Sequence, residues 1–232
     1  MDRVALRLFR GPVEPGKRNN MRVLVTGATG FVGTALCEML VQHGHAVRAA
    51  QRVNSPLAGR PFELAAVGDL GPETDWSAAL QEVQAIVHLA ARVHVMRETA
   101  ADPLAEFRQL NVAATAHLAR RAVAAGVKRF VYVSSIKVNG ERTEGQAFTA
   151  DAVPRPEDAY AQSKLEAEQA LREIGDRAGL EVVIVRPPLV YGPGVKGNFL
   201  SLLHWVERGL PLPLARCENR RSLVGITNLA DL

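Results

Sequence analysis

The chain has 232 residues, of which 47% are hydrophobic, so it can bury a sizeable core and is too apolar to be a disordered polypeptide. Its formal net charge of +4 is concentrated in residues 1–20, which hold five basic and two acidic residues, whereas the rest holds 23 and 22. A nearly neutral body argues against a nucleic-acid binder, and no run of ~18 apolar residues predicts a membrane helix.

Residues 1–20 are expected to be a disordered or non-native N-terminal extension. Their second half, GPVEPGKRNN, has two prolines and no periodicity, and a convincing strand follows it directly. The two cysteines, Cys37 and Cys217, have no paired spacing, which indicates a reducing compartment and a cytoplasmic protein. The histidines show no spacing typical of metal ligands, so no metal is expected.

Short apolar runs alternate with helical segments along residues 21–187, and this pattern predicts a parallel sheet covered by helices on both faces. Strands are predicted at 22–26, 45–50, 62–70, 85–91, 129–135 and 181–187. Helices are predicted at 31–44, near 75–82, at 102–125 and at 158–178. The expected fold class is therefore α/β, with a doubly wound parallel sheet (a Rossmann domain) over residues 21–187.

Residues 188–232 have a different texture and predict a small C-terminal cap over the substrate site. The stretch 187–198 is expected to be a loop, 199–209 a helix and 210–222 irregular. The last five residues, NLADL, look like the opening of another helix. The cap is therefore expected to be truncated at its C-terminus.

The stretch TGATGFVG places three glycines between the first predicted strand and the first predicted helix. Gly27 permits the turn, Gly30 lets the backbone approach a pyrophosphate, and Gly33 lets the helix pack closely on the strand. The N-terminus of that helix directs unpaired N–H groups toward the phosphates. The loop therefore predicts a dinucleotide site.

The end of the second strand, which reads AAQRV, decides how the adenosine ribose is held. An Asp or Glu at this position is typical of NAD sites. Here Gln51 can hydrogen-bond a ribose hydroxyl, and Arg52 can pair with the 2′-phosphate of NADP, so both cofactors stay open. Asp69, at the end of the third strand, is a candidate partner for the adenine amino group.

Tyr160 and Lys164, in DAYAQSK, are four residues apart on a predicted helix and so project from one face. A nearby ammonium favours the phenolate and is expected to lower the pKa of Tyr160. Such a tyrosine can exchange a proton with a sugar hydroxyl while a hydride moves, and the lysine can also hold the nicotinamide ribose. Ser135, at the carboxyl end of the fifth strand, can bond the same substrate oxygen.

The motifs VLVTGATGFVG, GDL, VHLAA, FVYVSSIKVNG, YAQSK and RPPLVYGPG occur in the order found in extended short-chain dehydrogenases/reductases. The chain resembles the nucleotide-sugar epimerase and dehydratase group of that family over residues 21–232. The resemblance implies NAD as cofactor, with NADP as the alternative, and a nucleotide-sugar substrate, UDP-linked. It also implies a homodimer formed through the helices at 102–125 and 158–178.

The resemblance gives Ser135, Tyr160 and Lys164 catalytic positions and makes Asn111 a structural asparagine behind the site. Substrate contacts are expected from Ser135, Asn198 and Arg221, with Arg221 on the nucleotide diphosphate. The cofactor is expected to contact Gly27, Gly30, Phe31, Val32, Gly33, Gln51, Arg52, Asp69, Leu70, Leu89, Ala90, Ala91, Tyr160, Lys164 and Pro187.

Two departures from the family pattern bear on the expected activity and on the choice of substrate. Family dehydratases carry an Asp–Glu pair after the catalytic threonine, where this chain has Ile136 and Lys137, so a 4,6-dehydratase is not expected. Leu189 stands where many members have an asparagine that touches the substrate.

The expected function is NAD(P)-dependent oxidation and reduction at C4 of a nucleoside-diphosphate sugar, by a UDP-sugar 4-epimerase. One alternative is an NADPH-dependent 4-keto nucleotide-sugar reductase. The second alternative is a non-catalytic dinucleotide-binding sensor or assembly protein. No nucleic-acid or membrane partner is expected in any of the three cases.

Overall fold

A computed structural model describes residues 20–52, 59–93, 102–143, 145–209, 211 and 219–232. The expectation for the N-terminal extension lies outside these residues, apart from Asn20. Most of the stretch 210–222, which was expected to be irregular, also lies outside them. None of the helices in the described ranges is long and apolar enough to cross a membrane.

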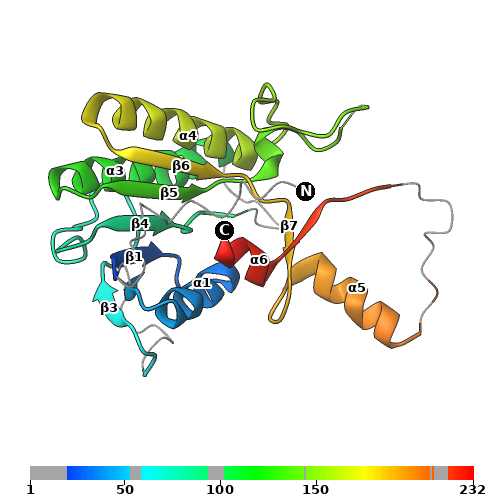
Figure 1. Ribbon diagram of the computed structural model, residues 1–232. Helices are drawn as coiled ribbons and strands as arrows, with labels where there is room; N and C mark the ends of the chain where they lie inside the picture. The colour runs from blue at the N-terminus through cyan, green and yellow to red at the C-terminus, as the bar shows by residue number, and fades with distance from the viewer. Residues whose placement is uncertain (1–19, 53–58, 94–101, 144, 210, 212–218) are drawn as a thin grey trace, which may run out of the picture.

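The centre of the protein is a parallel sheet of six strands in the order β3-β2-β1-β4-β5-β6 (Figure 1). This order reverses direction at β1, as in doubly wound sheets, and it confirms the expected Rossmann architecture. The strands are β1 Arg22–Thr26, β2 Ala46–Gln51, β3 Glu63–Ala66, β4 Ala85–His88, β5 Arg129–Val133 and β6 Glu181–Val185.

All six strands were predicted, but the structure ends several of them earlier. The greatest difference is at the third strand, predicted at 62–70 and observed only at Glu63–Ala66. The Val67 amide still donates to the Gln51 carbonyl at 2.9 Å, and the chain then leaves the sheet at Gly68, which has a left-handed φ of 70°. The segment is therefore available to line a cavity beside the carboxyl end of the strand.

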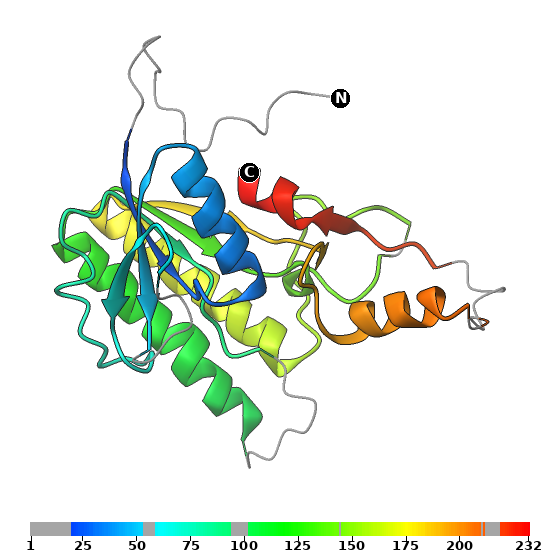
Figure 2. The same cartoon turned by 90° about the horizontal axis from the view of Figure 1, so that it is seen from below.

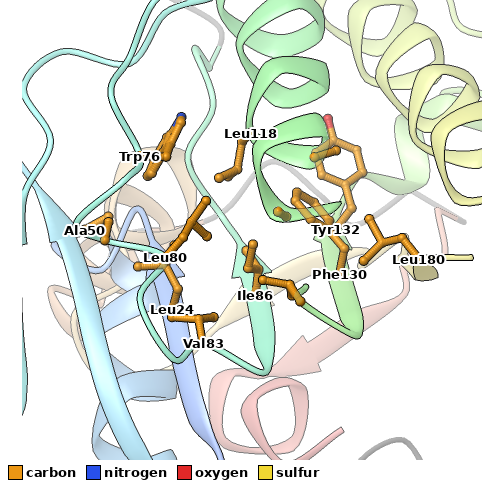
Figure 3. Close-up of a cluster of buried hydrophobic side chains, with 14 of the residues drawn as sticks. Leu24, Ala50, Trp76, Leu80, Val83, Ile86, Leu118, Phe130, Tyr132 and Leu180 are labelled. Atoms are coloured by element: carbon orange, nitrogen blue, oxygen red, sulfur yellow. The ribbon is translucent and has the colours of Figure 1, made fainter. Parts of the chain in front are cut away.

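Side chains alternate between two apolar layers on the two faces of the sheet. On one face, Val23, Val25 and Val47 pack with α1 (Phe31–Gln42) through its Leu36 and Leu40. The other face packs against α3 (Ala114–Ala124) and α4 (Ala159–Ala178) (Figure 3). The labelled core residues on that face include Leu24, Trp76, Ile86, Leu118, Phe130 and Tyr132.

The predicted helix at 102–125 is present but changes its winding. It runs as α2 (Pro103–Phe107), a π-helical segment η1 (Arg108–Ala113) and α3. Single π-turns inside helices are frequently found at functional sites. Here the π-turn contains Asn111, whose side chain reaches two other parts of the chain.

The helix predicted near 75–82 is wrong, because these residues form successive turns. Arg48 on β2 donates from Nη1 to the carbonyl oxygens of Ala78, Ala79 and Gln81, at 3.3, 3.0 and 2.7 Å. These acceptors would serve the backbone ladder in an α-helix. Arg48 therefore ties these turns to β2 across 30 residues or more.

The C-terminal cap begins with β7 (Leu189–Tyr191), inside the stretch that was expected to be a loop. Its partner is β8 (Leu223–Gly225), so the pairing has no local sequence signal. The predicted cap helix is confirmed as α5 (Gly197–Glu207), which has no buried residue and extends away from the sheet (Figure 2). The final helix, α6 (Ile226–Asp231), lies against α1.

We expect Gly33→Ala to destabilise the protein by about 1–3 kcal/mol, as overpacking in a core does. The added methyl group would lie 2.2 Å from the Gly27 carbonyl oxygen and 2.7 Å from Ala28 Cα, and neither backbone atom can move cheaply. Gly71→Ala is the matched control, because a Cβ there meets nothing within 4 Å. Urea unfolding compares the two, and an unchanged midpoint for Gly33→Ala would contradict the close packing of α1 on the loop.

Candidate active site

The glycine loop connects the end of β1 to the start of α1. Gly27 has a left-handed φ of 68°, and a Cβ there would lie 2.8 Å from the Ala90 amide nitrogen. Gly30 caps α1, and its N–H donates to the Gly27 carbonyl at 2.9 Å. The loop thus forms a cradle that side chains would fill, directly in front of the positive N-terminal end of a twelve-residue helix.

A cavity of about 620 Å³ opens in front of this loop, at the carboxyl edge of the sheet. It is bordered by the segments that follow β1, β2, β3 and β4. Nine of the expected cofactor residues line it: Gly27, Gly30, Gln51, Arg52, Asp69, Leu70, Leu89, Ala90 and Ala91. Its volume lies within the range typical of small-molecule and cofactor sites.

Six of the expected cofactor residues do not line this cavity: Phe31, Val32, Gly33, Tyr160, Lys164 and Pro187. Phe31, Val32 and Gly33 belong to the first turn of α1, and Gly33 serves helix packing instead. Pro187 follows β6, where its carbonyl accepts from the Ile136 amide at 3.1 Å. The cavity also has lining residues that sequence reasoning missed: Thr26, Thr29, Ala50, Val67, Gly68, Arg92, Val93 and Leu110.

The ribose end of the cavity holds both polar groups that the sequence singled out. Gln51 is the last residue of β2, and its buried Oε1 has no hydrogen-bond partner within the described residues. Such an orphaned acceptor fits a hydroxyl donor supplied by a ligand. Arg52 is exposed, and its Nη1 lies 3.7 Å from Asp69 Oδ1.

Tyr160 lies in the first turn of α4. The N-cap residue Asp158 accepts from the Ala161 amide at 2.6 Å, a capping bond worth about 1 kcal/mol. The Tyr160 ring meets Phe107 edge-on, with 6.1 Å between ring centroids.

Lys164 projects from the same face of α4 and is 1% exposed. Its Nζ donates to the Val133 carbonyl at 2.8 Å and lies 4.1 Å from the centre of the Tyr132 ring. Burial lowers the pKa of Lys164 to about 7, while the charge of Glu168 opposes that shift. The lysine thus reaches the carboxyl end of β5 and is close to losing its proton at neutral pH.

The expected lowering of the Tyr160 pKa is wrong for this structure. Burial raises the pKa of Tyr160, the charge of Asp158 raises it further, and the charge of Lys137 lowers it. Lys164 has no comparable effect on the phenol because its ammonium is turned to the Val133 carbonyl. Tyr160 is therefore a neutral phenol, and a proton donor, at pH 7.

Ser135 follows β5 and caps a short 3₁₀ helix, η2 (Ile136–Val138). Its Oγ accepts from the Lys137 amide at 3.2 Å, which fixes the side chain at the carboxyl end of the strand. The structure therefore brings Ser135 and α4 to the same edge of the sheet, since Lys164 contacts the last residue of β5.

Asn111 braces the site from behind and is 1% exposed. Its Oδ1 accepts from the Arg92 amide at 2.8 Å, and its Nδ2 donates to Arg92 O and Ser163 Oγ, both at 3.0 Å. Ser163 in turn donates to the Tyr160 carbonyl at 2.7 Å. Sequence reasoning missed Ser163, although its position three residues after Tyr160 places it on the same side of the helix.

The two expected substrate residues outside the sheet domain, Asn198 and Arg221, lie in the cap and are exposed. Asn198 is in the first turn of α5, and Arg221 precedes β8. Neither residue lines the cavity. The structure therefore does not bring them together with the cofactor residues.

Comparison with known proteins is consistent with this arrangement. Over 215 residues the chain is 47% identical to a UDP-glucose 4-epimerase of Vibrio cholerae, which covers 90% of this chain and 64% of the relative. It is 32% identical over 203 residues to a 3-beta-hydroxysteroid dehydrogenase of Mycolicibacterium neoaurum, with 84% and 55% covered. The chain thus spans about half to two thirds of the length of these curated relatives.

A solved structure of MoeE5 in complex with UDP-glucuronic acid and NAD is 29% identical. It superposes with a TM-score of 0.73 over 90% of this chain and 69% of that one. The model of the NAD dependent epimerase/dehydratase family matches residues 23–232, nearly the whole described structure. The chain belongs to the NAD dependent epimerase/dehydratase family.

Proposed function

We propose that this protein is an NAD-dependent enzyme that oxidises and reduces C4 of a UDP-linked sugar, and so acts as a UDP-sugar 4-epimerase. The observation that carries the proposal is that Lys164, on the helix that also bears Tyr160, reaches the carboxyl end of β5, which Ser135 follows, at the sheet edge that also bears the glycine-loop cavity. The 47% identity to a UDP-glucose 4-epimerase supports the sugar substrate.

The cavity fits two parts of NAD, the pyrophosphate and the adenosine ribose. The glycine cradle and the N-terminus of α1 suit a pyrophosphate, and the unpartnered Gln51 Oε1 suits a ribose hydroxyl. Asp69 would bond the adenine amino group, and Leu89 to Ala91 would lie along the cofactor. When bound, NAD would accept a hydride from C4 of the sugar, and its reduced form would donate that hydride back.

Tyr160 would move the proton of the C4 hydroxyl. As a phenolate it accepts that proton during oxidation, and as a phenol it returns the proton during reduction. Ser135 would hold the same oxygen by a hydrogen bond and fix its position. Lys164 would hold the nicotinamide ribose. To favour the phenolate as well, its ammonium would have to turn from the Val133 carbonyl toward Tyr160, because burial raises the pKa of the phenol.

A 4-keto nucleotide-sugar reductase that uses NADPH is the second candidate, and Arg52 is the observation that favours it. Its guanidinium borders the cavity next to Gln51, where a 2′-phosphate would lie. The exposed Asp69 carboxylate 3.7 Å away offsets this charge and favours NAD. A non-catalytic sensor has less support, because the Tyr160–Lys164 pair is intact.

We also infer a cytoplasmic location from the unpaired spacing of the cysteines.

We expect Tyr160→Phe to lower turnover of a UDP-sugar by roughly 10²–10⁴, the usual contribution of a positioned general acid–base. NAD affinity and the unfolding midpoint should stay close to wild type, because the variant loses one oxygen and little volume. Tyr191→Phe removes the same oxygen from an exposed tyrosine in the cap and is the control. Near-native turnover of Tyr160→Phe in a steady-state assay would remove Tyr160 from the mechanism.

We expect Arg52→Ala to weaken NADP binding about tenfold and to leave NAD binding unchanged, because a charge-assisted contact to the 2′-phosphate is lost. Calorimetric titration of both cofactors measures the ratio. Arg60→Ala is the control, since Arg60 is an exposed arginine that pairs with Glu38 outside the cavity. An unchanged ratio in Arg52→Ala would make Arg52 a surface residue that only pairs with Asp69.

The homodimer is proposed to form through α2–η1–α3 and α4, which lie side by side on one face of the sheet (Figure 2). Light scattering at micromolar concentration should report a dimer. Gln169→Glu, at an exposed position on α4, should shift the protein toward the monomer because it places like charges across a two-fold interface. Leu203→Glu, at an exposed position on α5, is the control and should leave the protein a dimer. A monomeric wild type would contradict this interface, and so would a dimer that only Leu203→Glu breaks.

A further inference from the structure

A second charged residue is buried on the same face of α4 as Lys164. Glu168 follows Lys164 by four residues, so the two side chains are neighbours on the helix. Glu168 is 0% exposed and Lys164 is 1% exposed. Glu168 does not line the cavity, so the mechanism above leaves this buried charge unexplained.

Two arginines hold the Glu168 carboxylate. Arg186 binds it with both prongs of its guanidinium, from Nε to Oε1 at 2.9 Å and from Nη2 to Oε2 at 2.5 Å. Arg172 adds a contact to Oε2 at 3.1 Å. Burial opposes ionisation, but the hydrogen bonds and charges of the groups around the carboxylate, Arg186 foremost and Arg172 among them, prevail and lower the pKa of Glu168. Glu168 is therefore a carboxylate at neutral pH.

The same arginine connects α4 to the segment that contains Ser135. Arg186 Nη1 donates to Asn139 Oδ1 at 3.2 Å, and Asn139 ends the short helix that Ser135 begins. A bidentate Arg–carboxylate pair fixes both distance and orientation. The clamp therefore sets the position of α4 relative to the end of β5.

The groups that face Lys164 explain why its charge needs support. Tyr132 on β5 presents its ring to the ammonium, and the pKa of Tyr132 is raised by burial, so its phenol is neutral. His88 on β4 is fully buried between Thr26 and Thr115, and burial lowers its pKa to about 3, so it is also neutral. Glu168 is the carboxylate whose charge favours the ammonium, and Arg186 and Arg172 hold that carboxylate.

We propose that Glu168 is a positioning residue for Lys164: clamped by Arg186, its carboxylate keeps the Lys164 side chain an ammonium at the carboxyl end of β5. The use of that ammonium, to hold the cofactor ribose and to favour the Tyr160 phenolate, rests on the proposed function. The electrostatic dependence of Lys164 on Glu168 does not rest on it.

Nuclear magnetic resonance of the ¹³Cε-labelled lysines tests this dependence directly. The chain has five lysines, at positions 17, 128, 137, 164 and 196, and Lys164→Met identifies the resonance of Lys164. In the wild type its titration midpoint should be near pH 7. In Glu168→Gln the midpoint should be lower by about one pH unit, because the opposite charge is lost and the burial stays.

Glu166→Gln is the matched control, because it removes the same charge from the same helix. Glu166 pairs with Arg108 on the outer side, and its loss should leave the midpoint of Lys164 unchanged. Where Glu168→Gln does not fold, Glu168→Asp decides, because its shorter carboxylate should give a midpoint between those expected for the wild type and for Glu168→Gln. A folded Glu168 variant with the wild-type midpoint would overturn the inference.

A cofactor readout separates this inference from the proposed function. If the ammonium holds the ribose, NADH affinity should fall as pH rises through the Lys164 midpoint, and in Glu168→Gln the fall should begin at lower pH. A wild-type protein that binds NADH at no pH would refute the proposed function and leave the lysine titration to decide the role of Glu168. If NADH affinity depends on pH in the same way in the wild type and in Glu168→Gln, the proposed role of Glu168 is wrong.

Discussion

The candidate site depends on the burial of one ammonium group, that of Lys164, on the helix that also carries Tyr160. A charge taken out of water is costly unless polar groups compensate for it, and Lys164 is almost completely enclosed. A carbonyl at the end of β5, the face of an aromatic ring and a clamped carboxylate one turn along the helix compensate for it together. Each of these groups comes from an element of the sheet domain, so the packing of that domain determines the surroundings of Lys164.

The cavity proposed for the cofactor lies at the same edge of the sheet for a different physical reason. Parallel strands end together, and the chain leaves β1, β2, β3 and β4 in loops that enclose one cavity. Asn111 connects the two halves, because its amide binds the backbone of Arg92 at the cavity and the hydroxyl of Ser163 below Tyr160. These hydrogen bonds link the cavity wall to the first turn of α4.

Local patterns in the sequence predicted most of the fold and nine of the residues that line the cavity. Strand–glycine–helix spacing predicted the turn at Gly27, and the four-residue spacing predicted a shared face for Tyr160 and Lys164. Interactions between distant residues were beyond such patterns. Arg48 bonds carbonyls 30 and more residues away, in the turns that stand where a helix was predicted, and β7 pairs with a strand that begins only at Leu223.

The same limit applies to the charges of the site. The spacing of Tyr160 and Lys164 gave no indication that burial raises the pKa of the phenol or that the ammonium bonds the Val133 carbonyl. Both facts depend on how deeply α4 sits against β5. The role of Arg186 was equally hidden, because it depends on β6 ending beside Glu168, 18 residues earlier in the chain.

If this sheet edge oxidises and reduces C4 of a nucleotide sugar, the hydrogen on that carbon must leave as a hydride and return, and labelling this hydrogen follows it. The protein would be incubated with NAD and UDP-glucose deuterated at C4, and the sugar examined by nuclear magnetic resonance. We expect UDP-galactose that keeps its deuterium at C4, because the hydride returns to the carbon it left and Tyr160 exchanges only the hydroxyl proton. Product that has lost the deuterium, or no product from folded protein with NAD bound, would contradict the account.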